Sequence, residues 1–125
     1  SYTSPKNSSQ IQLGIFTALT GDFREINVPT LVSKCVWSEN NNVIYYALPG
    51  SIPEKAVWPD GYNTKQFTTA DTFWKINLTS GEKTRLVELN KISGRFDVSK
   101  LFLNQDESEL FFVNRLDDRL YKIIL

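Results

Sequence analysis

The sequence predicts an all-β chain of antiparallel four-stranded meanders, and three observations lead to this fold class. Short apolar runs alternate with polar turns, aromatic and β-branched residues concentrate in those runs, and the pattern recurs along the chain. Of the 125 residues, 41% are hydrophobic and 13% are aromatic, which suits a globular domain rich in strands. No stretch keeps helical apolar spacing over the ~11 residues of a typical helix.

The elements are expected in the following order. Residues 1–10, SYTSPKNSSQ, are polar and Ser-rich and indicate a flexible leader or linker. Residues 12–28 alternate around the turn Thr20-Gly21-Asp22, which predicts a hairpin. Further strands are expected at 31–38 and 43–48, on either side of the Asn-rich turn at 39–42, and at 71–78 and 83–89, on either side of the turn at 79–82.

The last thirty residues, 96–125, read as a compact meander. Three apolar runs, KLFLN, ELFFVNR and RLYKIIL, are separated by the short polar turns QDES and LDD. Strands joined by such short connections pair with their neighbours in the antiparallel sense. The sequence therefore predicts three antiparallel strands at this end of the chain.

Internal repetition is the strongest sequence evidence for the architecture. A shift of 66 positions aligns Lys34 with Lys100 and Trp37 with Leu103, and it superimposes the polar turns that follow. A shift of 47 aligns FWKINL with LYKIIL, and a shift of 60 aligns Gly21 with Gly81. Repeated four-stranded meanders are typical of β-propeller blades, so we expect a propeller fragment of about two to three blades.

The repeats divide the chain into unequal parts. Residues 11–30 are expected to form the end of one blade, and residues 31–90 a complete blade that carries an insert at 49–70. Residues 91–125 are expected to form a last blade that lacks its outer strand. A self-contained sandwich or open barrel is the alternative architecture.

Three segments resemble the repeats of TolB-like bacterial propellers: SENNNVIYYALP, DTFWKINLTSGEKTRLVEL and LFLNQDESELFFVNRLDDRLYKIIL. In that family a polar turn leads into an aromatic strand, which is followed by a "W.I" or "LY.I" strand and a "TG" turn. The chain departs from the family in lacking Asp-Gly in the turns between the first two strands of a blade, and in carrying the long insert. The resemblance implies an extracytoplasmic location in bacteria, periplasmic or at the cell surface.

The resemblance also implies a non-catalytic binding or scaffold module, the C-terminal part of a propeller. The alternatives are an accessory or substrate-positioning part of a larger enzyme, with catalytic residues outside this chain, and a purely structural assembly subunit. A propeller ring needs ~4–8 blades. We therefore expect the remaining blades of a longer chain, or neighbouring copies, as partners, with strand addition along residues 120–125.

The insert at 49–70 is the candidate binding loop, because loops of this length are usually functional or disordered. Trp58, Tyr62 and Phe67 supply anchor-type rings for a protein or peptide partner, and Asp60 lies among them. The alternative is that the rings fold back and cover the flank of a blade. Asp60-Gly61-Tyr62-Asn63 is expected to be a β-turn rather than a metal loop.

Composition argues against several other functions. Lys plus Arg and Asp plus Glu are balanced at 14 each, which provides no basic field for nucleic acid, and no apolar run approaches the ~20 residues of a membrane span. The chain has no histidine, so no catalytic residue, metal ligand or cofactor is assigned. Cys35 is expected to be a buried hydrophobe, and the acidic turns 106–109 and 117–118 are expected to be solvated.

Overall fold

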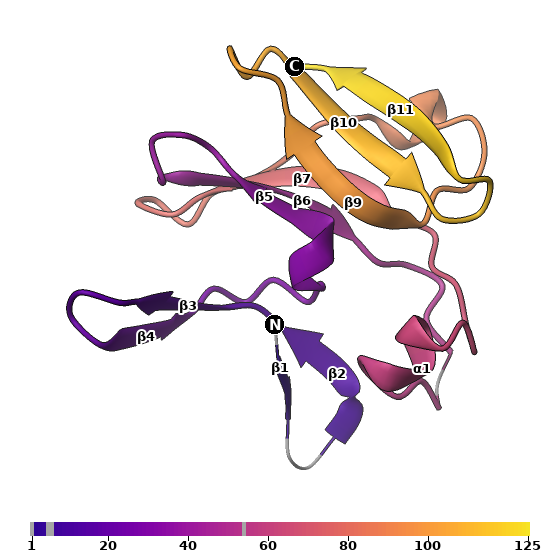
Figure 1. Cartoon of the computed structure of the whole chain (residues 1–125), viewed down its shortest axis with the longest axis horizontal. Helices are drawn as coiled ribbons and strands as arrows, with labels where there is room; N and C mark the ends of the chain where they lie inside the picture. The colour runs from indigo at the N-terminus through magenta and orange to yellow at the C-terminus, as the bar shows by residue number, and fades with distance from the viewer. Residues whose placement is uncertain (1, 5–6, 54) are drawn as a thin grey trace.

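The computed structural model describes residues 2–4, 7–53 and 55–125 and confirms the all-β prediction (Figure 1). The strands are β1 (Tyr2–Ser4), β2 (Asn7–Gln12), β3 (Gly14–Thr17), β4 (Asp22–Glu25), β5 (Cys35–Trp37), β6 (Val43–Leu48), β7 (Thr72–Asn77), β8 (Lys83–Arg85), β9 (Val98–Leu103), β10 (Glu109–Asn114) and β11 (Arg119–Ile124). Short helical turns are η1 (Val32–Lys34), α1 (Asp60–Asn63) and η2 (Leu89–Lys91).

The middle sheet is an antiparallel meander in the order β5-β6-β7-β8. Strands β6 and β7 pair without interruption from Val43 opposite Asn77 to Leu48 opposite Thr72. The insert leaves and rejoins the sheet at one point, where Gly50 and Ala70 exchange backbone hydrogen bonds of 2.9 and 3.0 Å. The last strand of this sheet, β8, is shorter than expected. The apolar pattern predicts a strand over 83–89, whereas β8 ends at Arg85.

The last sheet has the order β11-β10-β9, as the three apolar runs predicted. Strand β10 pairs with β11 from Glu109 opposite Ile124 to Asn114 opposite Arg119. Its pairing with β9 shifts register near Asn114, where Val98 rather than Ser99 lies opposite. In the described part of the chain, β11 and β9 form the two edges of this sheet.

Two hairpins precede the middle sheet. Strands β3 and β4 pair in register, with Phe16 opposite Phe23, as the alternating pattern predicted. Strands β1 and β2 also pair, so the described residues of the N-terminal segment form a hairpin instead of the flexible leader expected from composition. Antiparallel pairing needs only backbone N–H and C=O groups. Ile11, at the end of β2, is buried, and it anchors this hairpin.

Three layers are stacked in Figure 1, with β9–β11 above the middle sheet and β3–β4 below it. The lower face of the middle sheet carries Ile44, Tyr46 and Ile76, which form one core cluster with Leu13 and Val28. Its upper face contributes Ala47 and Phe73 to a second cluster, together with Val98, Leu101, Leu110 and Phe112 of the last sheet. The central strands of the middle sheet, β6 and β7, therefore contribute buried side chains to a core cluster on each face.

The strands recur at the shifts found in the sequence. A shift of 66 carries β6 onto β10, and a shift of 47 carries β7 onto β11, residue for residue. The turns match as well, since Asn41 and Glu107 both have a φ of 57°. Gly21 and Gly81 have φ values of 74° and 75°, the left-handed region that favours glycine. Backbone geometry thus repeats in these strands and turns, whereas η1 (Val32–Lys34) corresponds at the shift of 66 to the first half of β9.

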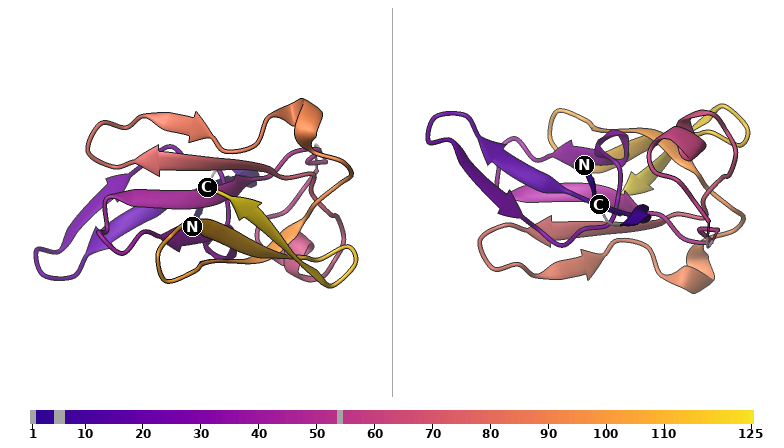
Figure 2. Two further views of the ribbon diagram at one scale, coloured as in Figure 1. Left: turned by 90° about the horizontal axis from the view of Figure 1, so that it is seen from above. Right: turned by 90° about the horizontal axis from the view of Figure 1, so that it is seen from below.

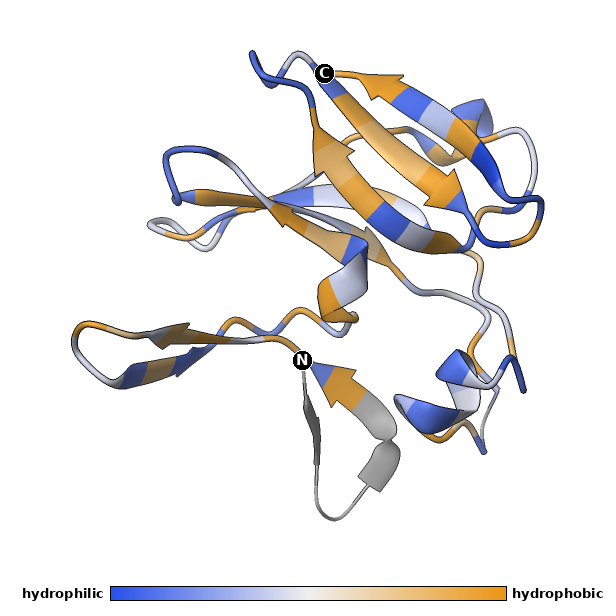
Figure 3. Cartoon of the chain, viewed as in Figure 1, coloured by the Kyte–Doolittle hydropathy of each residue, from blue (hydrophilic) through white to orange (hydrophobic). Residues whose placement is uncertain are grey.

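The outer face of the last sheet is uncovered by the described residues, and its apolar side chains lie among the charged side chains of Lys100, Glu109 and Lys122. Phe102 and Phe111 stack there with ring centroids 5.3 Å apart, and Leu120 and Ile124 are 60% and 68% exposed. Figure 3 shows hydrophobic residues running along β9 and β10 and polar residues in the turns between them.

Candidate functional site

The insert places the predicted aromatic residues together and turns them inward. Ring centroids are 5.6 Å apart for Trp58 and Tyr62, and 5.0 Å apart for Trp58 and Phe67. Trp58 and Tyr62 are 2% and 4% exposed and form a cluster with Ile11 and Leu31. These two rings therefore fill the interior of the fold, the arrangement expected if they cover a flank, and they do not form an open contact surface.

Asp60 does not join the rings. It is exposed at the first position of α1, so the segment predicted as a β-turn is a single helical turn. The helix lies at the opposite end of the molecule from the turn of hairpin β3–β4, as both views in Figure 2 show. The helix brings the Tyr62 side chain under the sheets while leaving Asp60 in solvent.

Beneath the insert lies an ion cluster that composition and spacing did not predict. Lys34 has no solvent exposure, and its Nζ lies 2.6 Å from Oδ2 of Asp71 and 2.8 Å from Oδ1 of Asp97. The third donor position of the ammonium is used by Thr69 Oγ1 at 3.2 Å. The Tyr62 hydroxyl also donates to Asp97. All three ammonium hydrogens thus have acceptors, as a buried charge requires.

The two carboxylates are also held by the backbone. Asp71 accepts from the Val98 amide at 2.8 Å and from the Thr69 hydroxyl at 2.6 Å. Asp97 accepts from the Thr69 amide at 3.1 Å. The cluster therefore ties together the start of the middle sheet, the end of the insert and the start of the last sheet.

Arg115 closes the cluster from the turn after β10. Its guanidinium lies 3.9 Å from the centroid of the Tyr62 ring, and it donates a hydrogen bond to the Tyr62 carbonyl. A guanidinium over an aromatic face is attracted by the ring quadrupole. Arg115 and Lys34 thus hold Tyr62 from two sheets.

The charges of the cluster shift its pKa values. Burial acts to lower the pKa of Lys34, but the charge of Asp71 and hydrogen bonds to both carboxylates outweigh it and raise that pKa. Burial acts to raise the pKa of Asp97, but hydrogen bonds from Lys34 and Tyr62 outweigh it and hold the pKa below 3.8. Burial raises the pKa of Asp71, opposed by Lys34. Lys34 and Asp97 therefore remain an ion pair at neutral pH.

The ion cluster is closed to solvent and to reactants. Lys34, Thr69 and Asp97 have no exposed surface, and Asp71 is 3% exposed, so no reactant reaches the ammonium. Such fully satisfied networks fix geometry and are costly to disrupt. The cluster positions the sheets and the insert.

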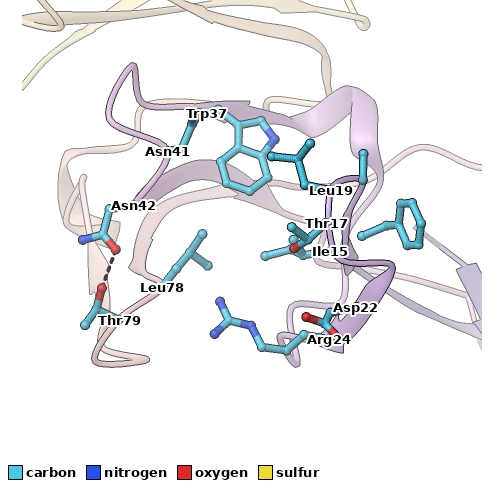
Figure 4. A pocket seen from close by; sticks show the side chains of 12 residues that line it. Ile15, Thr17, Leu19, Asp22, Arg24, Trp37, Asn41, Asn42, Leu78 and Thr79 are labelled. Atoms are coloured by element: carbon cyan, nitrogen blue, oxygen red, sulfur yellow. Dashed lines mark hydrogen bonds between the residues drawn. The ribbon is translucent and has the colours of Figure 1, made fainter.

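An open groove lies elsewhere, between hairpin β3–β4 and one end of the middle sheet (Figure 4). It has a volume of about 920 Å³ and is lined by the apolar side chains of Ile15, Leu19, Trp37 and Leu78. Leu19 is 99% exposed and Trp37 is 45% exposed. Ligand-binding sites are mostly apolar and carry a few placed polar groups. This groove is the candidate binding site of the described chain.

Polar side chains occupy the rim of the groove. Figure 4 shows Arg24 and Asp22 from β4 on one side and Asn42 with Thr79 on the other. The Thr79 hydroxyl donates to the Asn42 side-chain oxygen, which joins the turn before β6 to the turn after β7. One rim is thus a fixed pair of turns, and the other is the hairpin.

Cys35 and the acidic turn at 106–109 each make a hydrogen bond in the fold. Cys35 is half-buried and donates from Sγ to the Leu31 carbonyl, and burial raises its pKa to about 12. Glu107 accepts a hydrogen bond from the Glu39 amide at 2.7 Å, so this acidic turn is bonded to the turn between β5 and β6.

Among the described residues, no group of three or more potential metal-ligating side chains is assembled. No helix in the described part of the chain is long and apolar enough to cross a bilayer.

Sequence reasoning missed both the ion cluster and the groove. Lys34 appeared only as the counterpart of Lys100, and its partners lie 37 and 63 positions away. A usable signal was that Asp71 and Asp97 each come directly before an apolar run. For the groove, the signal was Trp37 beside an Asn-rich turn.

Comparison with known proteins adds no relative to this description. No protein-family model matches the chain, and no curated protein matches it.

Proposed function

We propose that this chain is a non-catalytic binding or scaffold module made of β-propeller blades similar to TolB-like repeats. The observation that carries the proposal is the middle sheet, which buries one face against Leu13, Ile26 and Val28, just beyond the ends of β3 and β4, and the other face against β9–β11. A four-stranded meander covered on both faces by similar sheets is the local arrangement of a blade in a propeller.

The uncovered face of the last sheet supports an interaction role. Four positions on the covered upper face of the middle sheet, which are Val36, Tyr45, Ala47 and Phe73, correspond at the repeat shifts to Phe102, Phe111, Val113 and Leu120. The first set lies under another sheet, whereas Phe102 and Leu120 are 38% and 60% exposed. Large apolar side chains that gather on an exposed face of a sheet indicate an interaction site.

The partner proposed for this face is an antiparallel sheet with an apolar face, like the one that β9–β11 presents to the middle sheet. The outer face of the last sheet is the repeat counterpart of the upper face of the middle sheet, which already forms such an interface once. In a solution of this chain alone, the available partner is a second copy.

The test is self-association measured by sedimentation velocity over a wide range of protein concentration. We expect the wild-type mass to rise with concentration and Phe102→Glu to weaken association by about tenfold or more, because a central aromatic anchor contributes about 2 kcal/mol or more. Leu89→Glu is the matched control, since Leu89 is 60% exposed outside this face. A wild-type chain that stays monomeric throughout contradicts the proposal.

A further inference from the structure

We propose that the groove beside β3 receives a β-hairpin from another polypeptide segment, which adds one strand to the free edge of β3. This inference rests on the proposed function, because it assumes that the chain joins strands of the same repeat. It concerns a different surface from the outer face of β9–β11. Strand addition at a sheet edge supplies affinity through main-chain hydrogen bonds, with side-chain pockets giving specificity.

Strand β3 is incompletely paired. At a shift of 60, β3 corresponds to β7 and β4 to β8, and the glycine turns between them have matching φ values. Strand β7 pairs with β8 on one side and with β6 on the other. Among the described residues, β3 pairs with β4 only. The position next to β3 that corresponds to β6 is therefore open.

Trp37 is more exposed than its counterpart in the repeat. It lies opposite Ile44 on the lower face of the middle sheet, the face that packs against the β3–β4 side. Its counterpart in the last sheet is Leu103, which packs into the cluster between the last and middle sheets. Trp37 is instead 45% exposed in the groove. A hairpin beside β3 would cover Trp37 as the inner strands of the middle sheet cover Leu103.

The groove continues an interface that the chain already forms. Ile15 and Leu78 pack at the edge of the cluster formed by the lower face of the middle sheet, and both also line the groove. An occupant would extend this cluster along β3. Ile15 and Thr17 of β3 line the groove, so a strand that pairs with the edge of β3 would also place side chains in the groove.

The repeat also fixes the expected register and chemistry. In the middle sheet, Tyr45 lies opposite Lys75 and Val43 opposite Asn77. Transferred by 60 positions, the incoming strand places its corresponding residues opposite Ile15 and Thr17. The residue opposite Ile15 points into the groove, because cross-strand partners share a face. The occupant is therefore a hairpin with a large apolar or aromatic residue at that position.

The probe for the test is a synthetic peptide with the sequence of residues 98–114, which spans β9, its turn and β10. It is added to the whole chain, and binding is followed by NMR titration and amide hydrogen exchange. We expect saturable binding and slower exchange of the amides of Gly14–Thr17. Leu19→Asp and Trp37→Ala should each weaken binding at least tenfold, because both side chains line the groove. A peptide of the same composition in scrambled order should not bind.

Leu89→Asp is the matched control and should bind the peptide as the wild type does. The inference is overturned if the peptide does not bind saturably, if Leu19→Asp leaves its affinity unchanged, or if protection appears along β11 instead of β3. The Phe102→Glu variant should bind the peptide normally. Loss of self-association in that variant with intact peptide binding, or the reverse, therefore separates the two proposals.

Discussion

The upper face of the middle sheet and the outer face of the last sheet occupy equivalent positions in the repeat, and only the first is covered by another sheet. On the middle sheet, Phe73 is 2% exposed beneath β9–β11, whereas its counterpart Leu120 on the last sheet is 60% exposed. Lys34 is buried between two carboxylates, and its counterpart Lys100 is exposed. The side chains are similar in kind. Whether a position is buried or exposed therefore depends on whether another sheet covers it, and not on the chemistry of its side chain.

The largest difference is expected between the two lysines. Lys34→Ala should lower the free energy of unfolding by about 5 kcal/mol, because it leaves Asp71 and Asp97 buried without their cation. Lys100→Ala is the matched control and should change it by less than about 0.5 kcal/mol. Denaturant unfolding of both variants gives the two values. Equal effects would show that Lys34 is not a buried partner of the carboxylates.

A smaller difference is expected between the two apolar counterparts. Phe73→Ala should lower the free energy of unfolding by about 3 kcal/mol. This is at the lower end for a buried ring, because the Phe112 ring centroid lies 4.7 Å from that of Phe73 and the Phe112 ring can move partly into the space. Leu120→Ala should cost less than about 1 kcal/mol in the monomer. Thermal and denaturant unfolding at low protein concentration measure both. A Leu120→Ala cost as large as that of Phe73→Ala would mean that its face is covered in solution.

The smallest effect depends on pH and tests the ion cluster alone. The pKa of Asp97 lies below 3.8 in the fold, so its ionised form stabilises the protein above about pH 4, and this contribution is lost as the pH falls through the folded-state pKa. Asp97→Asn should cost about 2 kcal/mol at neutral pH. The difference from wild type should shrink below about pH 4.

Unfolding curves from neutral pH down to about pH 3 measure this difference. Asp60→Asn is the control, because Asp60 is exposed and should give a small difference at every pH. A wild-type advantage over Asp97→Asn that stays constant across the series would mean that the charge of Asp97 is not what stabilises the cluster.

The sequence allowed the strands to be placed well, because alternation and repetition are local signals. The shifts of 66 and 47 predicted the correspondence of β6 with β10 and of β7 with β11 before any contact was known. The three aromatic residues of the insert were identified, but their direction was not. Whether Trp58 and Tyr62 face solvent depends on contacts with Ile11 and Leu31, which are far from them along the chain.

The N-terminal hairpin and the ion cluster were missed for different reasons. The strands β1 and β2 form in polar sequence through backbone pairing, which composition does not reveal. The pairing of Lys34 with Asp97 joins two sheets and has no period along the chain. The groove was missed because it depends on which strand positions are left open, a property of the assembled sheets.

The narrow neck of the insert has an evolutionary consequence. At Gly50 a Cβ atom would lie 2.7 Å from the Ala70 carbonyl oxygen, so a side chain there would push the two limbs of the neck apart. Because the chain enters and leaves at one point, the ladder between β6 and β7 is undisturbed by what lies beyond it. The corresponding connection between β10 and β11 is a short turn. The ladder itself therefore tolerates a long segment at this site, whereas Tyr62 and Thr69 within the segment are fixed by their hydrogen bonds in the ion cluster, so insertions and deletions that spare these two residues leave the sheets unchanged.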